Sequence, residues 1–515
     1  MKKRAQLPDA HTYTIIFRGC AKSDHPKLAV SEAVRLYNNM LNDSRLQPNT
    51  IHMNAVIQAC ARAGDIESML TIAGTADNGA RSPSAWTYAS LLTGLRADFK
   101  QLRKQQRGQE AAPQDPKQIA QAVQRSKSIW HEVIGRWHKG QILIDEELVC
   151  AMGRTLLLQA PKDRFEVLTL LEQTMNIPNL NGLEKSVGGA TDAAKSLPSS
   201  GAAPGEDTSV AKDPTEVAKV EATNVSRPTS HATPGRNTLS LVLSLAESTK
   251  HVQLGLKYWN LFVTEYEVVP DANNWQRMLV LLRLGKSGAN AASIISLMPT
   301  SFMKPATFRI ALSTCLRDNM NANTMANADL ILERMNEALA MPDPHALRTY
   351  LLVAMASHHR FRKQSDEGDI SGAKYGYGQQ ILGALDRLEA PYYKVRDSLG
   401  FQGSATPHPN ELGAKGYNDR RELIALARKM VGAYDKLLSE QMVDDKLVKK
   451  LRIRMAAINR YIFRFFDNRE KYEPNLPSAI KKRQQAAKDA AAGDERAEDW
   501  DTTSAERRAG QKVQL

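Results

Sequence analysis

The chain has 515 residues, of which 42% are hydrophobic and only 6% aromatic, and its mean hydropathy is −0.42. No stretch approaches the roughly 20 consecutive apolar residues that a membrane-spanning helix requires, so we expect no membrane span. Lys and Arg number 69 against 56 Asp and Glu, and the resulting net charge of +13 favours polyanionic partners such as nucleic acid.

The cysteines and the known catalytic motifs argue against a metal site and against catalysis. The four cysteines, Cys20, Cys60, Cys150 and Cys315, lie far apart and form no C-x-x-C pair. This spacing favours buried thiols in a reducing compartment and lacks the ligand pattern of a zinc site. Phosphate-binding, zinc-protease, nucleophile-elbow and zinc-deaminase motifs are also missing. We therefore expect no metal, no cofactor, no small-molecule substrate and no enzymatic activity.

A proline followed by an apolar run recurs along the chain. Pro48 and Pro83 are 35 residues apart, and so are Pro270 and Pro305. Such a fixed period is typical of repeat architectures, so the chain is expected to fold as an array of similar units.

The first units are predicted to be helical hairpins. Apolar residues recur at helical spacing over residues 10–22 and 29–42, and again over 50–63 and 66–74. Gly64-Asp65 interrupts the second pair, and the proline near each repeat end stops the preceding helix. One helix pair cannot bury its own apolar face, so neighbouring pairs must stack.

The residues of these units resemble the pentatricopeptide repeat. PDAHTYTIIFRGCAKS at 8–23 and PSAWTYASLLTGL at 83–95 resemble the opening of that repeat, and ARAGDIE at 61–67 resembles its inter-helix turn. AVRLYNNMLNDSRLQPN at 33–49 is similar to its second helix and terminal proline. The resemblance implies an all-α fold, an α-solenoid of stacked helix-turn-helix repeats in two blocks.

The first repeat block is expected over residues 8–179, with an insertion at 97–117 separating the helices of its third unit. A linker at 180–235 is rich in Ser, Ala, Gly, Pro and Thr. It is expected to be disordered, because it holds too few large apolar residues to offset its ordering entropy. The second block is expected over 236–391.

The C-terminal part departs from the repeat. Residues 359–379 and 400–415 are expected to be non-repeat excursions. Residues 417–468 are expected to form two helices with a basic face and a break near Gln441–Asp444. The charged stretch at 474–515, which has few apolar anchors, is expected to be a disordered tail.

The resemblance implies one nucleotide per repeat, read by the fifth residue of the first helix and the final residue of the repeat. It assigns Thr14 with Asn49 to the first repeat, implying adenine, and Asn54 with Ser84 to the second, implying cytosine. The same residue types are common helix N-caps, and that alternative stays open.

Most other units are poorly equipped for base reading. Their fifth and final residues are Ala89 with Asp145, Cys150 with Asn179, Leu241 with Asp271, Gln276 with Ala306, and Ala311 with Asp343. Apolar fifth residues cannot hydrogen-bond a base, so at most two or three repeats are expected to read sequence. Gln276 and Asp271 are the remaining base-reading candidates.

The second residue of each repeat is usually apolar in the family and sandwiches the base. The stacking candidates are Ile51, Trp86 and Phe308. Trp86 alone is equally compatible with a place in the core.

Phosphate contacts are predicted from a basic helix at 446–464. Lys450, Arg454, Arg460 and Arg464 form two i,i+4 pairs of like charge, which an anion would relieve. The alternative is a solvated helix face. A second basic run, HHRFRK at 358–363, is expected either to contact phosphates or to form a solvated loop, and the loop is the favoured interpretation.

Together these features predict a non-catalytic, single-stranded RNA-binding factor. The resemblance to fungal mitochondrial pentatricopeptide proteins of small-subunit rRNA maturation and group I intron splicing implies the mitochondrial matrix, with a transcript or rRNA precursor as partner. The small ribosomal subunit is a further expected partner. No complete presequence is visible after Met1, so the N-terminus is expected to be truncated or targeting to lie elsewhere. The alternatives are a protein-binding scaffold, such as a mitochondrial ribosome subunit or assembly factor, and a tetratricopeptide-like adaptor.

Overall fold

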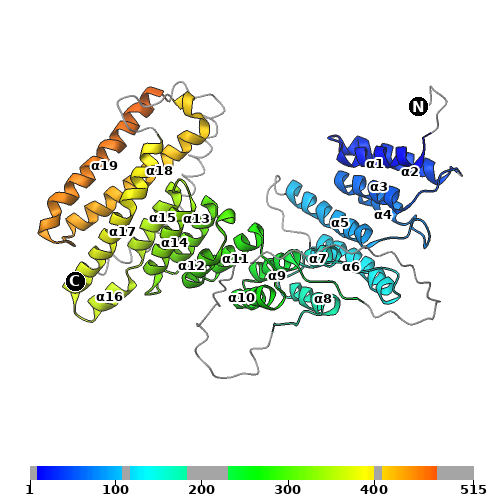
Figure 1. Ribbon diagram of the computed structural model, residues 1–515, viewed down its shortest axis with the longest axis horizontal. Coiled ribbons are helices and arrows are strands. Elements are labelled where there is room, and N and C mark those ends of the chain that lie inside the picture. Colours follow the sequence, from blue (N-terminus) through cyan, green and yellow to red (C-terminus); the bar gives the residue numbers. More distant parts are fainter. Residues whose placement is uncertain (1–7, 44, 107–115, 182–229, 400–408, 473–515) are drawn as a thin grey trace, which may run out of the picture. The chain divides into compact units, whose positions relative to one another are not determined.

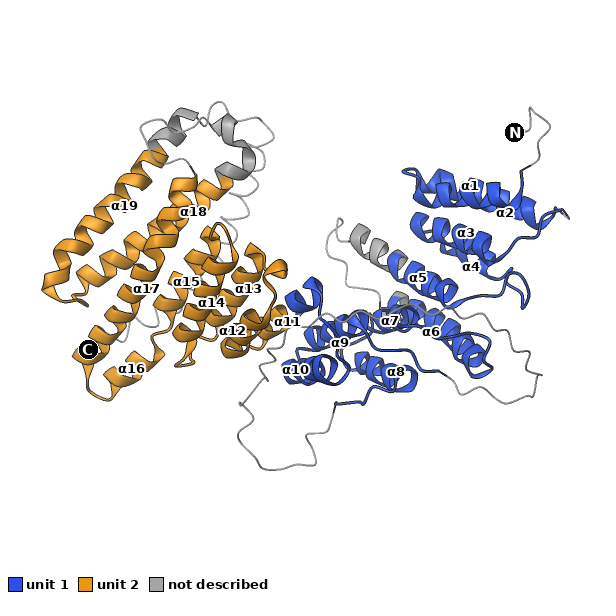
Figure 2. Ribbon diagram, in the orientation of Figure 1, with its two compact units in different colours: residues 1–277 blue, residues 278–515 orange. Residues whose placement is uncertain are grey.

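The computed structural model describes residues 8–43, 45–106, 116–181, 230–399 and 409–472. Every regular element within these ranges is a helix, which confirms the all-α prediction. The chain divides into two compact units, Met1–Arg277 and Met278–Leu515 (Figure 2), and the boundary falls inside one helix.

The first unit consists of consecutive helix pairs (Figure 1). Its helices are α1 Ala10–Lys22, α2 Pro26–Leu41, α3 Thr50–Ala63, α4 Ile66–Ala73, α5 Ala85–Gln106, α6 Pro116–His138, α7 Glu146–Leu156, α8 Glu166–Met175, α9 Arg236–Thr249 and α10 Val252–Asn260. Helix α11, Ala272–Leu284, contains the unit boundary. Helix α1 contacts α3, α3 contacts α5, α5 contacts α7 and α7 contacts α9. The first helices of successive pairs therefore form a row, as stacked helical repeats require.

The turn between α3 and α4 shows how the sequence sets these hairpins. Asn49 caps α3, because its side chain accepts hydrogen bonds from the backbone N–H groups of Ile51 and His52. Gly64 ends the helix in the left-handed region at φ 75°, where a side chain would be strained. Asp65 then caps α4 by accepting from the N–H of Ser68.

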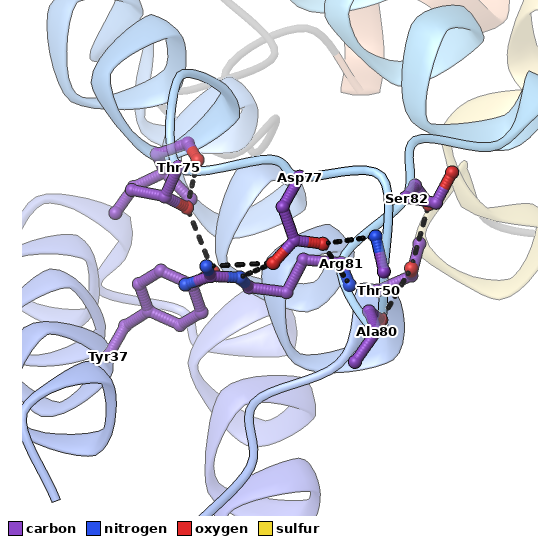
Figure 3. Close-up of polar contacts among 9 residues, drawn as sticks. Tyr37, Thr50, Thr75, Asp77, Ala80, Arg81 and Ser82 are labelled. Carbon is purple, nitrogen blue, oxygen red and sulfur yellow. Dashed lines mark hydrogen bonds and ion pairs between the residues drawn. The ribbon is translucent and has the colours of Figure 1, made fainter.

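The loop that follows α4 holds the start of α3 in place (Figure 3). The Thr50 N–H and hydroxyl donate to the backbone carbonyls of Ala80 and Ser82, at 3.0 and 2.8 Å. The loop itself is closed by an ion pair of 2.9 Å between Asp77 and Arg81. Since these bonds join the start of the second repeat to its end, the loop fixes where the next helix pair begins relative to α3.

The second unit repeats this arrangement with longer helices. Its helices are α12 Gly288–Leu297, α13 Pro305–Arg317, α14 Thr324–Ala338, α15 Pro344–Ala356, α16 His359–Asp366, α17 Ile370–Ser398, α18 Pro409–Ser439 and α19 Asp445–Tyr472. Helix α13 contacts α15, and α15 contacts α18, so the first helices of this unit form a row of their own from α13 to α18. The two C-terminal helices, with their break at 440–444, therefore form a further stacked pair.

Helices occupy most of one expected excursion and the end of the other. Residues 359–379 form α16 and the start of α17, because buried Phe361 packs against Tyr377 and close to Gly376. Helix α18 already begins at Pro409, inside the expected excursion at 400–415. In the first case the contact between Phe361 and Tyr377 holds helices through residues whose composition favours a loop.

Part of the insertion expected at 97–117 is helical, and the described ends of the linker are bonded to other residues of unit 1. Helix α5 runs to Gln106 and α6 begins at Pro116, so much of 97–117 is helical. The linker residues 182–229 and the tail at 473–515 lie outside the described residues. Both ends of the linker are anchored to unit 1. The Leu180 N–H donates to the Tyr258 hydroxyl, and the Ala232 N–H donates to the carbonyl of Thr174.

Burial protects three of the four thiols. Desolvation raises the pKa of Cys60, Cys150 and Cys315 to about 12, and it raises the pKa of half-buried Cys20. Because the thiolate is the reactive species, the native protein at pH 8 should react with iodoacetamide much faster at Cys20 than at the other three. Mass spectrometry of alkylated peptides, with unfolded protein as the control, measures this. Equal labelling of all four thiols in the native state would contradict the packing described here.

Candidate nucleic-acid interface

Capping residues define where each repeat begins. Asn49, Asp145 and Asp343 are the N-caps of α3, α7 and α15, and Ser84 and Asp271 accept hydrogen bonds from the first turns of α5 and α11. The predicted final residues of the repeats therefore lie at helix starts, with their side-chain oxygens bonded to backbone N–H groups. The side-chain oxygen of Asn49 is used for capping, and its amide nitrogen is not.

The fifth residue of a first helix contacts the third residue of the next first helix. The Thr14 hydroxyl lies 3.1 Å from Nε2 of His52. The Asn54 Oδ1 accepts a hydrogen bond of 2.8 Å from the Thr87 hydroxyl. The two predicted base-reading residues thus also join α1 to α3 and α3 to α5.

The sequence interpretation missed these third-position residues. Each is a buried polar side chain at the same place in its helix: His52, Thr87, Thr238, Asn274 and Thr307. The signal was available, because a polar residue recurs two positions after the first residue of these helices. Buried polar groups need partners, and His52, Thr87, Thr238 and Asn274 find theirs in the preceding repeat, so these residues orient one repeat on another.

His52 shows the geometry most completely. Its Nδ1 accepts from the Asn49 N–H at 3.1 Å, so Nε2 carries the proton of the neutral ring and donates to the Ala10 carbonyl at 2.8 Å. The Thr14 hydroxyl donates to the same carbonyl at 3.1 Å. Thr14 is therefore half-buried and held in a network. Asn54 differs, because its amide nitrogen has no hydrogen-bond partner among the described residues.

Two fifth positions differ from the sequence assignment. Helix α9 begins at Arg236, so its fifth residue is Ser240, whereas Leu241 is 1% exposed. Helix α13 begins at Pro305, and its fifth residue is Arg309 instead of buried Ala311. Both helices begin one or two residues earlier than the 35-residue period predicts, and this shifts the fifth position by the same amount.

The fifth residues of α13 and α15 are cationic and ion-paired. The Arg309 Nε donates to one oxygen of the Asp343 carboxylate at 2.7 Å, and a terminal guanidinium nitrogen donates to the other oxygen. Arg348, the fifth residue of α15, lies 3.4 Å from Glu422 of α18. These pairs connect α13 to α15 and α15 to α18, in the place where the first unit uses neutral polar side chains.

The stacking candidates divide between surface and core. Ile51 and Trp86 are 52% and 41% exposed, as a platform for a base requires. Phe308 is fully buried, so its assignment as a platform is wrong. The start of α13 at Pro305 makes Phe308 the fourth residue of the helix, which faces the core, and places Ala306 second. Gln276 is exposed, as a base-reading residue must be, whereas Ala89 and Cys150 are buried.

The phosphate-contact candidates also divide. Lys450, Arg460 and Arg464 are exposed on α19. Arg454 bonds to Asp386 at 2.6 Å and to Glu389 at 2.9 Å, both on α17, so it joins two helices and is not free for phosphate. In the run at 358–363, which forms α16 instead of a loop, the cations are exposed around the buried Phe361 ring.

Neither a metal site nor a membrane span is found in the part of the chain that the structure describes. Among the residues that the structure describes, no three His, Cys, Asp or Glu side chains gather closely enough to hold a metal ion. No helix within the described ranges is long and apolar enough to cross a membrane.

Comparison with known proteins gives a similarity over the N-terminal repeats. Residues 14–124 match a family model described as pentatricopeptide repeat-containing protein. A chloroplastic pentatricopeptide repeat-containing protein of Arabidopsis thaliana is 30% identical over 95 residues, which are 18% of this chain and 12% of that protein. The chain thus matches only a small part of that relative's length.

Solved structures of the maize pentatricopeptide repeat protein PPR10 also align. The alignment with the crystal structure of PPR10 alone covers 94% of this chain and 76% of the PPR10 chain, at 13% identity and a TM-score of 0.25. Its complex with an 18-nt psaJ RNA element covers 90% and 75%, with the same identity and TM-score.

Proposed function

We propose that this protein binds single-stranded RNA along the row of first helices in its N-terminal unit, without catalysing a reaction. The observation that carries the proposal is the surface of α3 and α5. Ile51 and Trp86 are exposed second residues of adjacent first helices, and Asn54 between them holds an unbonded amide donor. A base placed between two such side chains can stack on both and accept a hydrogen bond from the amide.

We expect the first repeat to contribute less to base recognition than the second repeat. Its second residue, His11, is exposed, but the hydroxyl of Thr14 is already engaged by His52 and Ala10. We therefore propose that Asn54 with Ser84 forms the main reading position, and that Thr14 with Asn49 assists. Ser240 of α9 and Gln276 of α11 are further polar fifth residues. Asp271, at the start of α11, would read a base together with Ser240.

The proposed setting is an organelle, specifically the mitochondrial matrix, with a transcript or rRNA precursor as ligand. Similarity to a repeat family whose matched relative is chloroplastic supports an organellar location. Action in small-subunit rRNA maturation or group I intron splicing, and association with the small ribosomal subunit, belong to the same proposal. Crosslinking the protein to RNA in fractionated organelles, followed by sequencing of the footprint, tests the compartment and the ligand together.

The decisive measurement is RNA affinity as a function of salt. We expect fluorescence anisotropy with a short single-stranded RNA to show binding that weakens as salt rises, because phosphate contacts release counterions. Trp86→Ala should weaken binding by about 5- to 150-fold, since stacking on an aromatic contributes ~1–3 kcal/mol per base. The matched control is Leu28→Ala, which removes an exposed apolar side chain of the same unit from α2.

A protein-binding scaffold is the second candidate, and one observation favours it for the second unit. There the fifth residues Arg309 and Arg348 are bonded to carboxylates and Phe308 is in the core, so this part of the row offers little to a base. Absence of RNA binding, or an affinity that does not change with salt, would contradict the RNA proposal and favour the scaffold.

A further inference from the structure

The outward face of α19 carries a concentration of unpaired positive charge. Six basic side chains along it are exposed and form no ion pair with any described residue: Lys446, Lys449, Lys450, Arg452, Arg460 and Arg464. Asp445 is the one carboxylate among residues 445–466. Lys446 and Lys450, like Arg460 and Arg464, are like charges at i,i+4, and such pairs destabilise a helix slightly. An anionic group bound to this face would remove that cost.

The same face exposes large apolar side chains. Ile453 is 63% exposed and Phe463 is 68% exposed, and both lie among the cations. The opposite side of α19 is already used, because buried Leu451 and Ile458 pack toward the unit and Arg454 bonds to α17. Helix α19 belongs to the last described pair of the row, where repeat proteins usually present a polar outer surface. An exposed face of this composition fits a partner with both carboxylates and an apolar group.

The chain contains a segment of the complementary composition. Residues 494–501 read DERAEDWD, with five carboxylates, one arginine and Trp500. It follows α19 by 22 residues, since that helix ends at Tyr472. This segment lies outside the described residues.

The connection is long enough to reach back. Ile453 precedes Tyr472 by 19 residues, or about 28 Å along a helix. A random coil of 22 residues has a root-mean-square span of about 26 Å. The distance to the middle of the face therefore matches the span of a coil of this length, and such a tether would give the segment a local concentration on the order of millimolar.

We propose that the acidic segment 494–501 docks on the outward face of α19. Its carboxylates pair with the lysines and arginines, and Trp500 covers apolar surface at Ile453 or Phe463. RNA phosphates would satisfy the cations but leave the exposed Ile453 without a partner, so the segment fits the face better. The docking needs no RNA and stands independently of the proposed function. One consequence is that any polyanion reaching this face must displace the segment.

Zero-length carbodiimide crosslinking of the full chain without RNA tests the proposal. The reagent joins a lysine amine to a carboxylate in contact with it, and peptide mass spectrometry identifies the pair. We expect crosslinks from residues 494–501 to Lys446, Lys449 or Lys450 at least tenfold above those to Lys27 and Lys139, which are exposed lysines of the first unit. Comparable yields at all five lysines would overturn the proposal.

Two further arms separate docking from chance encounters and from contact between copies. Replacing Ile453 and Phe463 with serine leaves every lysine and carboxylate in place, and the crosslink yield should fall severalfold. An unchanged yield would overturn the role of the apolar surface and with it the specific docking. In a mixture of light and heavy isotope-labelled protein, the crosslinks should join light to light and heavy to heavy. In an equal mixture, mixed light-to-heavy crosslinks at about half of the total, the statistical result of pairing between copies, would place the segment on a second copy and overturn the intramolecular proposal.

Discussion

Phe308→Ala should lower the free energy of unfolding of the second unit by about 3–5 kcal/mol, because the ring is fully buried and its removal leaves a cavity. The side chain belongs to α13, whose contacts with α15 continue the row of first helices. Loss of the ring therefore weakens a helix-helix contact as well as the core. Hydrogen exchange measured by mass spectrometry should show the largest loss of protection in peptides from α13 and α15.

The contrast with Trp86→Ala distinguishes core from platform. Both residues are candidate stacking platforms by sequence, yet Trp86 is 41% exposed. Its replacement should change stability far less than that of Phe308, while its effect on RNA affinity should be large. An exchange pattern in which Phe308→Ala leaves α13 and α15 as protected as in the wild type would contradict the buried position assigned to the ring.

Gly378→Ala should destabilise the second unit by about 1–3 kcal/mol, because the new Cβ has no space. It would lie 2.2 Å from the backbone carbonyl oxygen of Met442 and 2.7 Å from its Cβ. Met442 belongs to the turn between α18 and α19, so relief requires α17 to move away from that turn. A backbone atom cannot rotate aside as a flexible side chain can. Thermal unfolding followed by circular dichroism measures the effect.

Gly432→Ala is the matched control for that substitution. Gly432 lies in α18 of the same unit, and a Cβ added there meets nothing within 4 Å. Alanine should stabilise the helix by about 0.5–1 kcal/mol, since glycine has a higher conformational entropy in the unfolded chain. The two glycine substitutions should therefore shift the melting temperature in opposite directions. Shifts of equal sign would show that the turn does not pack against α17 as described.

Local rules explain how much of the fold the sequence predicts. The hairpin of α3 and α4 follows from Asn49, Gly64 and Asp65, because caps and a left-handed glycine act within a few residues. Helix starts without such a cap were misplaced. Gly235 before α9 offers no side-chain cap, and the error moved the assigned fifth residue from Ser240 to Leu241.

The candidate site depends more on contacts between repeats. Ile51 and Trp86 are exposed as the repeat pattern predicts. The bond between Thr14 and His52 joins residues 38 positions apart, and no local pattern specifies it. The same holds for Arg454, which the helical pattern places on a basic face but which α17 neutralises through two carboxylates.

The sequence by itself determined that this protein is built from helix pairs of about 35 residues, because periodicity and capping are properties of neighbouring residues in the chain. Only the tertiary structure decided which side chains of those helices remain available to a ligand. Phe308 and Trp86 have similar side chains, yet one is in the core and the other on the surface. Availability is set by which helix packs on each face, and that depends on residues far away in the sequence.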